Sequence, residues 1–236
     1  MSLASLVPAR DRCVPVDEAF APMLPDAGLV RGRIVGCTGP AAMSLGLALA
    51  ARATTTGSWL AVVGVPMLGV EAAAELGVPL SRLVAIDVDG RPAAWAERVG
   101  AAADGFDLIL TRPPAGADRV VRKVRQRLQA RGVVLIAVGP SNPGIGCDVE
   151  FTTTSVAWAG LGSGHGSLAA RRATVRVGGR RVPRPVERDL WLPGPGGRVE
   201  VVPERHGDID AHLDVDVDVD VDVDVDVDGR ELRRAG

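Results

Sequence analysis

Aromatic residues and cysteines are scarce in this sequence. It has no tyrosine, three phenylalanines and four tryptophans in 236 residues. The three cysteines, Cys13, Cys37 and Cys147, are odd in number and widely spaced, form no CxxC pair and are accompanied by only three histidines. This usage argues against a disulfide framework and against a zinc site.

Long apolar runs and targeting signals are also lacking. The longest apolar run, residues 59–70, is interrupted by Gly64 and Pro66. It is shorter than the roughly 20 residues that a membrane helix needs. The N-terminal stretch MSLASLVPARDR has no basic segment followed by an apolar one, as a secretory signal would. We therefore expect a cytoplasmic protein with no membrane contact.

Lysine is nearly absent, because Lys123 is the only one of the 27 basic residues that is not arginine. Together with the many Ala, Gly and Val residues, this is typical of a GC-rich coding sequence, so arginine content alone does not predict nucleic-acid binding. The net charge of −2 combines +6 over the first 207 residues with −8 over the rest. In 214–228, eight Asp alternate with seven Val. Strands of this kind would pair like charges, so we expect a disordered acidic tail.

Apolar runs rich in Val, Ile and Leu alternate with helical patterns between residues 33 and 138. The expected strands lie near 33–37, 59–65, 82–87, 107–111 and 133–138. The expected helices lie near 41–54, 69–76, 92–102 and 117–130. Each helix is short enough for a crossover between parallel strands, so the sequence predicts an α/β fold with a mostly parallel central sheet covered by helices.

After Pro143 the pattern changes to extended segments without intervening helices. The glycine-rich link at 161–167 and the Gly pair at 178–179 are typical of hairpin turns. We expect these segments to add antiparallel strands to one edge of the sheet. The Pro/Gly cluster at 192–197 predicts the end of the compact fold.

The stretch GRIVGCTGPAAMSLGLALA, residues 32–50, predicts a strand, a glycine-containing turn and a helix. A functional phosphate loop has the pattern G-x-x-x-x-G-K-[ST], in which the lysine neutralises phosphates and the hydroxyl holds magnesium. If Gly39 is the first glycine, Ser44 replaces the second glycine, Leu45 the lysine and Gly46 the hydroxyl residue. We expect a simple connecting turn in which Leu45 fills an apolar gap; residual weak nucleotide binding is the alternative.

Several stretches of this chain resemble the RecA core, in the same order and at similar spacing. LPDAGLVRGRIVGCTGP (24–40) is similar to the entry into the RecA phosphate loop. The resemblance continues through AAELGVPLSRLV (73–84), DLILTRPPA (107–115), VVLIAVG (133–139) and ARRATVRVGGRRVPRPVERDLWLP (170–193). It implies a degenerate RecA-like core over 24–195, an N-terminal extension over 1–23 and a C-terminal segment over 196–236 that carries the Asp-Val tail.

The resemblance also implies that the ATPase residues are lost. The RecA glutamate that activates water corresponds to Val65 in this chain, and the Walker B aspartate corresponds to Arg112. The position of the RecA glutamine that senses the phosphate falls near Pro140. The segments that correspond to the DNA-binding loops are short, at 113–117 and 141–146. The resemblance therefore implies a protein that is not an enzyme and has no catalytic residue, cofactor or metal.

A RecA-like chain of this length without ATPase residues is similar to the ImuA group, especially its shortened actinobacterial form. That resemblance implies an adaptor of the SOS response to DNA damage, acting in mutagenic translesion synthesis. Its partner would be an ImuB-like Y-family polymerase homologue, and through it an error-prone replicative polymerase subunit, with the adaptor joining the nucleoid on DNA damage. The alternatives are a regulator of SulA type, which inhibits cell division, and a RecA paralogue that binds ATP weakly.

Two surfaces are candidates for partner binding. The helical pattern at 117–131 places an apolar stripe against basic positions. Those basic residues are Arg119, Arg122, Lys123, Arg125 and Arg127. They form either a solvated face or a contact for an acidic partner or, weakly, for DNA.

The second candidate surface is the antiparallel edge at 170–195, where unpaired strand edges and Trp191 would bind a partner. Trp191 is either a partner anchor or a residue that caps the core. We predict core positions for Trp59 and Trp158, and partly exposed positions for Trp95 and Trp191. We favour the second surface, because buried aromatic anchors carry more binding energy than exposed charges.

Overall fold

The computed structural model of the chain describes residues 12–141, 144–162 and 165–203. By its internal contacts the chain divides into residues 1–204 and residues 205–236. All the described residues belong to the first unit. The predicted Asp-Val tail, and its predicted disorder, lie outside them.

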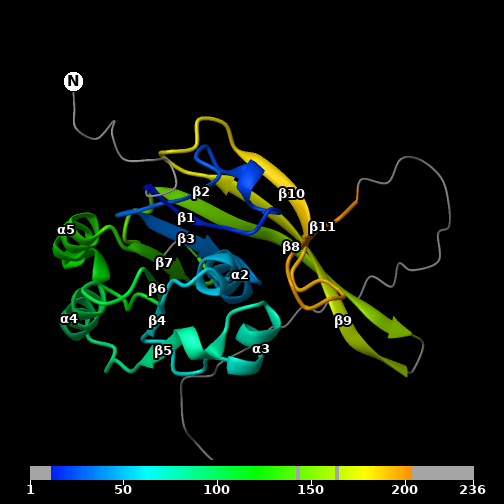
Figure 1. The fold of residues 1–236 in the computed structure, drawn as a ribbon, viewed down its shortest axis with the longest axis horizontal. Helices are drawn as coiled ribbons and strands as arrows, with labels where there is room; N and C mark the ends of the chain where they lie inside the picture. The colour runs from blue at the N-terminus through cyan, green and yellow to red at the C-terminus, as the bar shows by residue number, and fades with distance from the viewer. Residues whose placement is uncertain (1–11, 142–143, 163–164, 204–236) are drawn as a thin grey trace, which may run out of the picture. The chain divides into compact units, whose positions relative to one another are not determined.

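A nine-stranded sheet forms the centre of this unit, in the order β11-β10-β9-β8-β3-β7-β6-β4-β5 (Figure 1). The strands that pair in parallel are β3 (Ile34–Thr38), β4 (Leu60–Val63), β5 (Leu83–Ile86), β6 (Leu108–Thr111), β7 (Val134–Val138) and β8 (Val149–Gly162). The strands added in antiparallel fashion are β9 (His165–Gly178), β10 (Val186–Trp191) and β11 (Glu200–Val201). The predicted α/β fold, with a parallel sheet and a C-terminal antiparallel extension, is confirmed.

The four predicted helices form close to the expected positions. They are α2 (Ala42–Thr55), α3 (Val70–Glu75), α4 (Pro92–Ala102) and α5 (Val121–Arg131). Short 3-10 turns lie at η2 (Ala21–Met23), η3 (Leu80–Arg82) and η4 (Ala117–Arg119). Gly132 ends α5 with a φ of 68°, a left-handed conformation that favours glycine. Within the described ranges, no helix is both long and apolar enough to cross a membrane.

The central strands bury apolar side chains on both faces of the sheet. On β6, for example, Leu108 and Leu110 belong to one core cluster and Ile109 to the other. Helices α2 and α3 cover the first face, and α4 and α5 cover the second (Figure 1). Burial on both faces explains why these strands read as continuous apolar runs rather than alternating ones.

An antiparallel ribbon precedes the parallel sheet. Strand β1 (Cys13–Pro15) pairs with β2 (Gly28–Val30), and η2 lies between them. Phe20 is fully buried, with its ring edge-on to that of Phe151 on β8 at a centroid distance of 6.0 Å. Residues 13–23, which the sequence placed in an extension before the core, thus pack into the core cluster that α2 also joins.

The predicted positions of three tryptophans are wrong. Trp59 and Trp158, expected in the core, are 39% and 45% exposed. Trp59 stands just before β4, and Trp158 lies on the part of β8 beyond Thr152, the last residue that pairs with β3. Trp59 therefore precedes a buried strand, and Trp158 lies beyond the parallel part of the sheet, although their residue type and neighbours resemble those of core positions.

Trp95, expected to be partly exposed, is fully buried on α4. Its indole Nε1 donates a hydrogen bond to Thr111 Oγ1 at 2.8 Å, which satisfies both buried polar groups. The short polar partner at the end of β6 lets the large ring enter the core, and no local pattern around Trp95 indicates this contact.

Candidate functional site

The turn predicted to be a degenerate phosphate loop joins β3 to α2 through three residues, Gly39 to Ala41. Gly39 has a φ of 91°, and a Cβ there would lie 2.1 Å from the backbone oxygen of Thr153 on β8. Thr153 is buried; its Oγ1 accepts a hydrogen bond from Ala41 N at 3.1 Å and donates one to Thr38 O at 3.1 Å. The threonine hydroxyl thus accepts the hydrogen bond from a backbone N–H of the turn, and in functional loops such N–H groups bind phosphate.

The positions that correspond to the lysine and the hydroxyl residue face the sheet. Leu45 is fully buried, which agrees with its predicted role in filling an apolar gap. A Cβ added at Gly46 would lie only 2.8 Å from Val138 Cγ1 of β7. Ser44 is half-buried on the same first turn of α2. The helix therefore packs too closely on the sheet for the longer polar side chains of a functional loop at positions 45 and 46.

The other positions carried over from RecA lie at the carboxyl ends of the parallel strands. Val65 is half-buried against the core, whereas Arg112 and Pro140 are exposed. Arg112 and Pro140 line an open groove of about 460 Å³, and among the described residues of its lining Asp118 is the only one with a carboxylate. Ligands of parallel α/β sheets bind at this edge, but the side chains present supply neither a lysine nor a pair of carboxylates. Among the described residues, no group of three His, Cys, Asp or Glu could hold a metal ion.

Arg125, predicted on the exposed basic face of the helix, is instead a structural residue. Its Nη1 contacts Asp148 Oδ2 at 2.7 Å, and its Nη2 donates to the carbonyl of Gly146. Asp148 is buried, also accepts a hydrogen bond from Ile34 N at 3.0 Å, and has Arg33 Nη1 at 3.9 Å. This cluster joins α5, β3 and the start of β8, so Arg125 does not belong to a free partner-binding surface.

The remaining basic residues of the helix divide into paired and unpaired ones. Arg127 pairs with Asp104, which follows α4. Arg119, Arg122 and Lys123 are exposed, and none of them forms an ion pair with any residue that the structure describes. Of the basic residues of this helix, these three are therefore the ones that remain available for an acidic partner or for DNA.

Trp191 is half-buried at the end of β10. It lies opposite Arg172 of β9 and Glu200 of β11. The sequence predicted unpaired strand edges here, but β11 pairs with the end of β10 and Val202 N donates to Asp189 O at 3.1 Å. Less of the β10 edge is therefore unpaired than expected, because β11, a strand of two residues that follows the Pro/Gly cluster, pairs with it.

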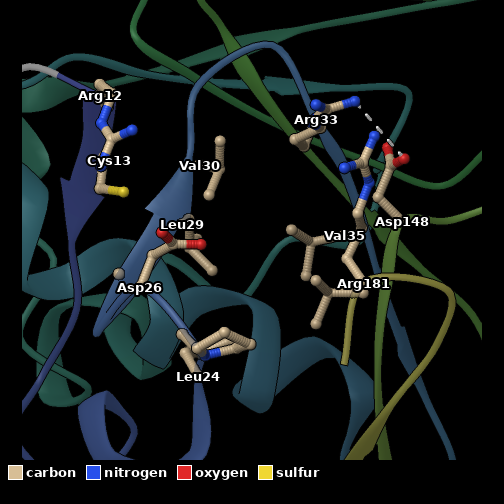
Figure 2. Close-up of a pocket in the computed structure, with 13 residues that line it drawn as sticks. Arg12, Cys13, Leu24, Asp26, Leu29, Val30, Arg33, Val35, Asp148 and Arg181 are labelled. Carbon is tan, nitrogen blue, oxygen red and sulfur yellow. Dashed lines mark ion pairs between the residues drawn. The ribbon is translucent and has the colours of Figure 1, made fainter. Parts of the chain in front are cut away.

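A pocket that the sequence did not indicate lies between the β1–β2 ribbon and the amino ends of β3 and β8. Its volume is about 250 Å³. Figure 2 shows Arg12 and Asp26 on one side of it, Arg33 and Arg181 on the other, and apolar side chains between them. These residues come from segments that are far apart in the sequence, so no motif or spacing could have found them.

A family model described as the MT3502 N-terminal domain matches residues 22–144, which is more than half of the chain. The protein belongs to the MT3502 N-terminal domain family. The matched part begins within η2 and ends after β7, so it contains the β3–α2 turn and α2 to α5 but none of the strands from β8 onward. No curated protein matches the chain.

Proposed function

We propose that the protein is a non-enzymatic adaptor in DNA-damage-induced mutagenic translesion synthesis. Its partner is an ImuB-like Y-family polymerase homologue, through which it reaches an error-prone replicative-type polymerase. The observation that carries the proposal is the β3–α2 turn. Buried Leu45 stands where a phosphate site has its lysine, and the Thr153 hydroxyl accepts the hydrogen bond of the Ala41 N–H that would otherwise face a phosphate. The resemblance of the sequence to the ImuA group supports the choice of process and partner.

The energetics of the turn support a role without nucleotide. A functional loop makes charge-assisted contacts from lysine and from the magnesium-binding hydroxyl residue, each worth about 1.5–3 kcal/mol. Leu45 and Gly46 supply neither. Their loss amounts to roughly two to four decades of affinity. A fold that keeps its core but not these contacts is suited to presenting surfaces to other proteins.

Deletion of the gene tests the process. After ultraviolet irradiation, the deletion strain should lose induced mutagenesis while it filaments like the parent strain. A strain that keeps induced mutagenesis but fails to filament would support a SulA-type inhibitor of cell division instead. In the parent strain, the tagged protein should co-purify with the Y-family polymerase homologue after irradiation.

Substitution of Trp191 tests the partner surface within this proposal. A half-buried tryptophan that enters a partner pocket carries about 2 kcal/mol or more, which corresponds to about a thirtyfold change in Kd. Trp191→Ala should therefore weaken binding of the polymerase homologue by about thirtyfold in a titration of purified proteins. Trp59→Ala is the matched control, because Trp59 is also partly exposed but lies before β4, at a distant strand of the same sheet. It should bind like the parent protein.

Charge reversal on α5 separates the two candidate surfaces. Arg122→Glu combined with Lys123→Glu leaves the Arg125–Asp148 pair intact and should slow association and reduce its dependence on salt. Normal binding by Trp191→Ala, together with loss of the complex at every salt concentration after charge reversal, would make α5 the interface.

A further inference from the structure

The pocket beside the β1–β2 ribbon combines an apolar floor with cationic walls. Its floor is made by side chains from the ribbon and from the first residues of β3 and β8, namely Leu24, Leu29, Val30, Val35 and Val149. Its volume of about 250 Å³ is below the range of about 300–1,000 Å³ that is usual for drug-sized ligands and cofactors. A space of this size suits one or two apolar side chains of a peptide better than a nucleotide.

The charged residues around this floor are unequal in number. Among the described residues, three arginines and two aspartates line the pocket. One of the aspartates, Asp148, is already bound by Arg125 at 2.7 Å and by Ile34 N at 3.0 Å. Arg12 and Arg181 are exposed and form no ion pair within the described part of the chain, and Arg33 has Asp148 only at 3.9 Å. Guanidinium groups on two sides of the pocket are therefore free to bind carboxylates.

We propose that this pocket binds a short acidic and apolar peptide segment of a partner protein. An apolar side chain of the peptide enters between Leu29, Val30 and Val35, and flanking carboxylates bind Arg33 and Arg181 on one side and Arg12 on the other (Figure 2). Arginine is suited to this role because its planar group binds a carboxylate through two parallel hydrogen bonds. Nucleic acid fits less well, because its continuous phosphate charge would face Asp26 and Asp148.

This inference goes beyond the proposed function, because it holds whichever protein supplies the peptide. It also concerns a different group of side chains, because neither Trp191 nor Arg122 lines this pocket. The two proposals can therefore fail separately. The chain could bind the peptide but not the polymerase homologue, or it could bind the polymerase homologue normally after the pocket has been altered.

Cys13 provides a reporter inside the pocket. It lines the pocket and is half-buried, whereas Cys37 and Cys147 are buried. Burial raises the pKa of the Cys147 thiol to about 12 and raises that of Cys37 further, so neither forms the reactive thiolate at pH 8. Burial, and after it the negative charge of Asp26, raises the pKa of the Cys13 thiol less than burial raises the pKa of the other two thiols. Alkylation of Cys13 is therefore slow but selective. Cys13→Ser should abolish the labelling, which would show that Cys13 is the labelled residue.

The test measures the rate at which iodoacetamide labels Cys13 in the full chain, with blocked six-residue peptides as probes. A peptide of alternating Asp and Leu should slow labelling at least about fivefold at saturation, because it covers the thiol. Three probes of the same length serve as comparisons, namely alternating Lys and Leu, alternating Asp and Ser, and oligothymidine. Equal protection by any of the three would overturn the proposal, because the site would then select apolar groups alone, anions alone or nucleic acid.

Two variants of one loop make the test specific. Arg181→Glu should weaken protection by the Asp-Leu peptide about tenfold in peptide concentration, because it replaces a carboxylate-binding group by a repelling one. Arg184→Glu is the matched control, since Arg184 is an exposed arginine of the same turn that does not line the pocket. Equal effects of the two variants, or no protection of the unchanged protein by the Asp-Leu peptide, would contradict the proposed site.

Discussion

Leu45→Lys should destabilise the protein strongly instead of restoring a nucleotide site. Leu45 is fully buried between α2 and the sheet, so a lysine there would place a charge among apolar side chains or lose its proton. An unpaired buried charge costs about 3–5 kcal/mol. For a chain of this size, that loss lowers the melting temperature by about 6–20 °C. Thermal unfolding followed by circular dichroism measures it.

Ser44→Lys is the matched control for this substitution. Ser44 precedes Leu45 on the first turn of α2 but is half-buried, so a lysine at this position reaches water. Its cost should be limited to the unfavourable position of a cation at a helix start, about 0.3–1 kcal/mol. Equal melting temperatures for Leu45→Lys and the parent would show that position 45 opens to solvent above the turn, as the lysine of a functional loop does.

Asp148→Ala should cause the second large loss of stability. The carboxylate of Asp148 binds Arg125 Nη1 at 2.7 Å and Ile34 N at 3.0 Å, and its removal leaves both donors without their partner. Breaking a buried pair in this way costs about 3–5 kcal/mol. The Arg125 side chain is 22% exposed and keeps some hydration, so the lower end of that range is expected. Urea unfolding of the variant and of the parent measures the difference.

Asp104→Ala is the control for Asp148→Ala. Asp104 pairs with two arginines of α5, Arg127 and Arg131, but its side chain is 40% exposed. Surface pairs of this kind contribute little to stability because water and salt screen them. If Asp104→Ala and Asp148→Ala cost the same, the Asp148 cluster does not have the structural role assigned to it.

The sequence predicts the central sheet and its helices well because both faces of the sheet are covered. A strand such as Val134–Val138, buried on both faces, is apolar throughout, and α4 begins at a proline that is suited to the first turn of a helix. The β1–β2 ribbon was missed because three-residue strands show no periodicity. Phe20, which lies between its two strands, packs on Phe151, a contact between residues far apart in the sequence.

The candidate site was predicted only where a local motif exists. The replacements at Ser44, Leu45 and Gly46 are visible in one stretch of sequence, but the hydroxyl that fills the turn comes from Thr153, over a hundred residues later. Arg125 looked like its exposed neighbours, and only the fold places Asp148 beside it. The side chains of the peptide pocket likewise meet only when the ribbon packs beside β3.

Calorimetric titration with Mg-ATP tests most directly the claim that the β3–α2 turn serves packing rather than nucleotide binding. Because Leu45 and Gly46 supply neither a lysine nor a hydroxyl, and Thr153 already binds Ala41 N, the purified chain should release no binding heat up to about 1 mM Mg-ATP. A Kd in the micromolar range or below would contradict the account, since it would require the turn to open and present its backbone to phosphates.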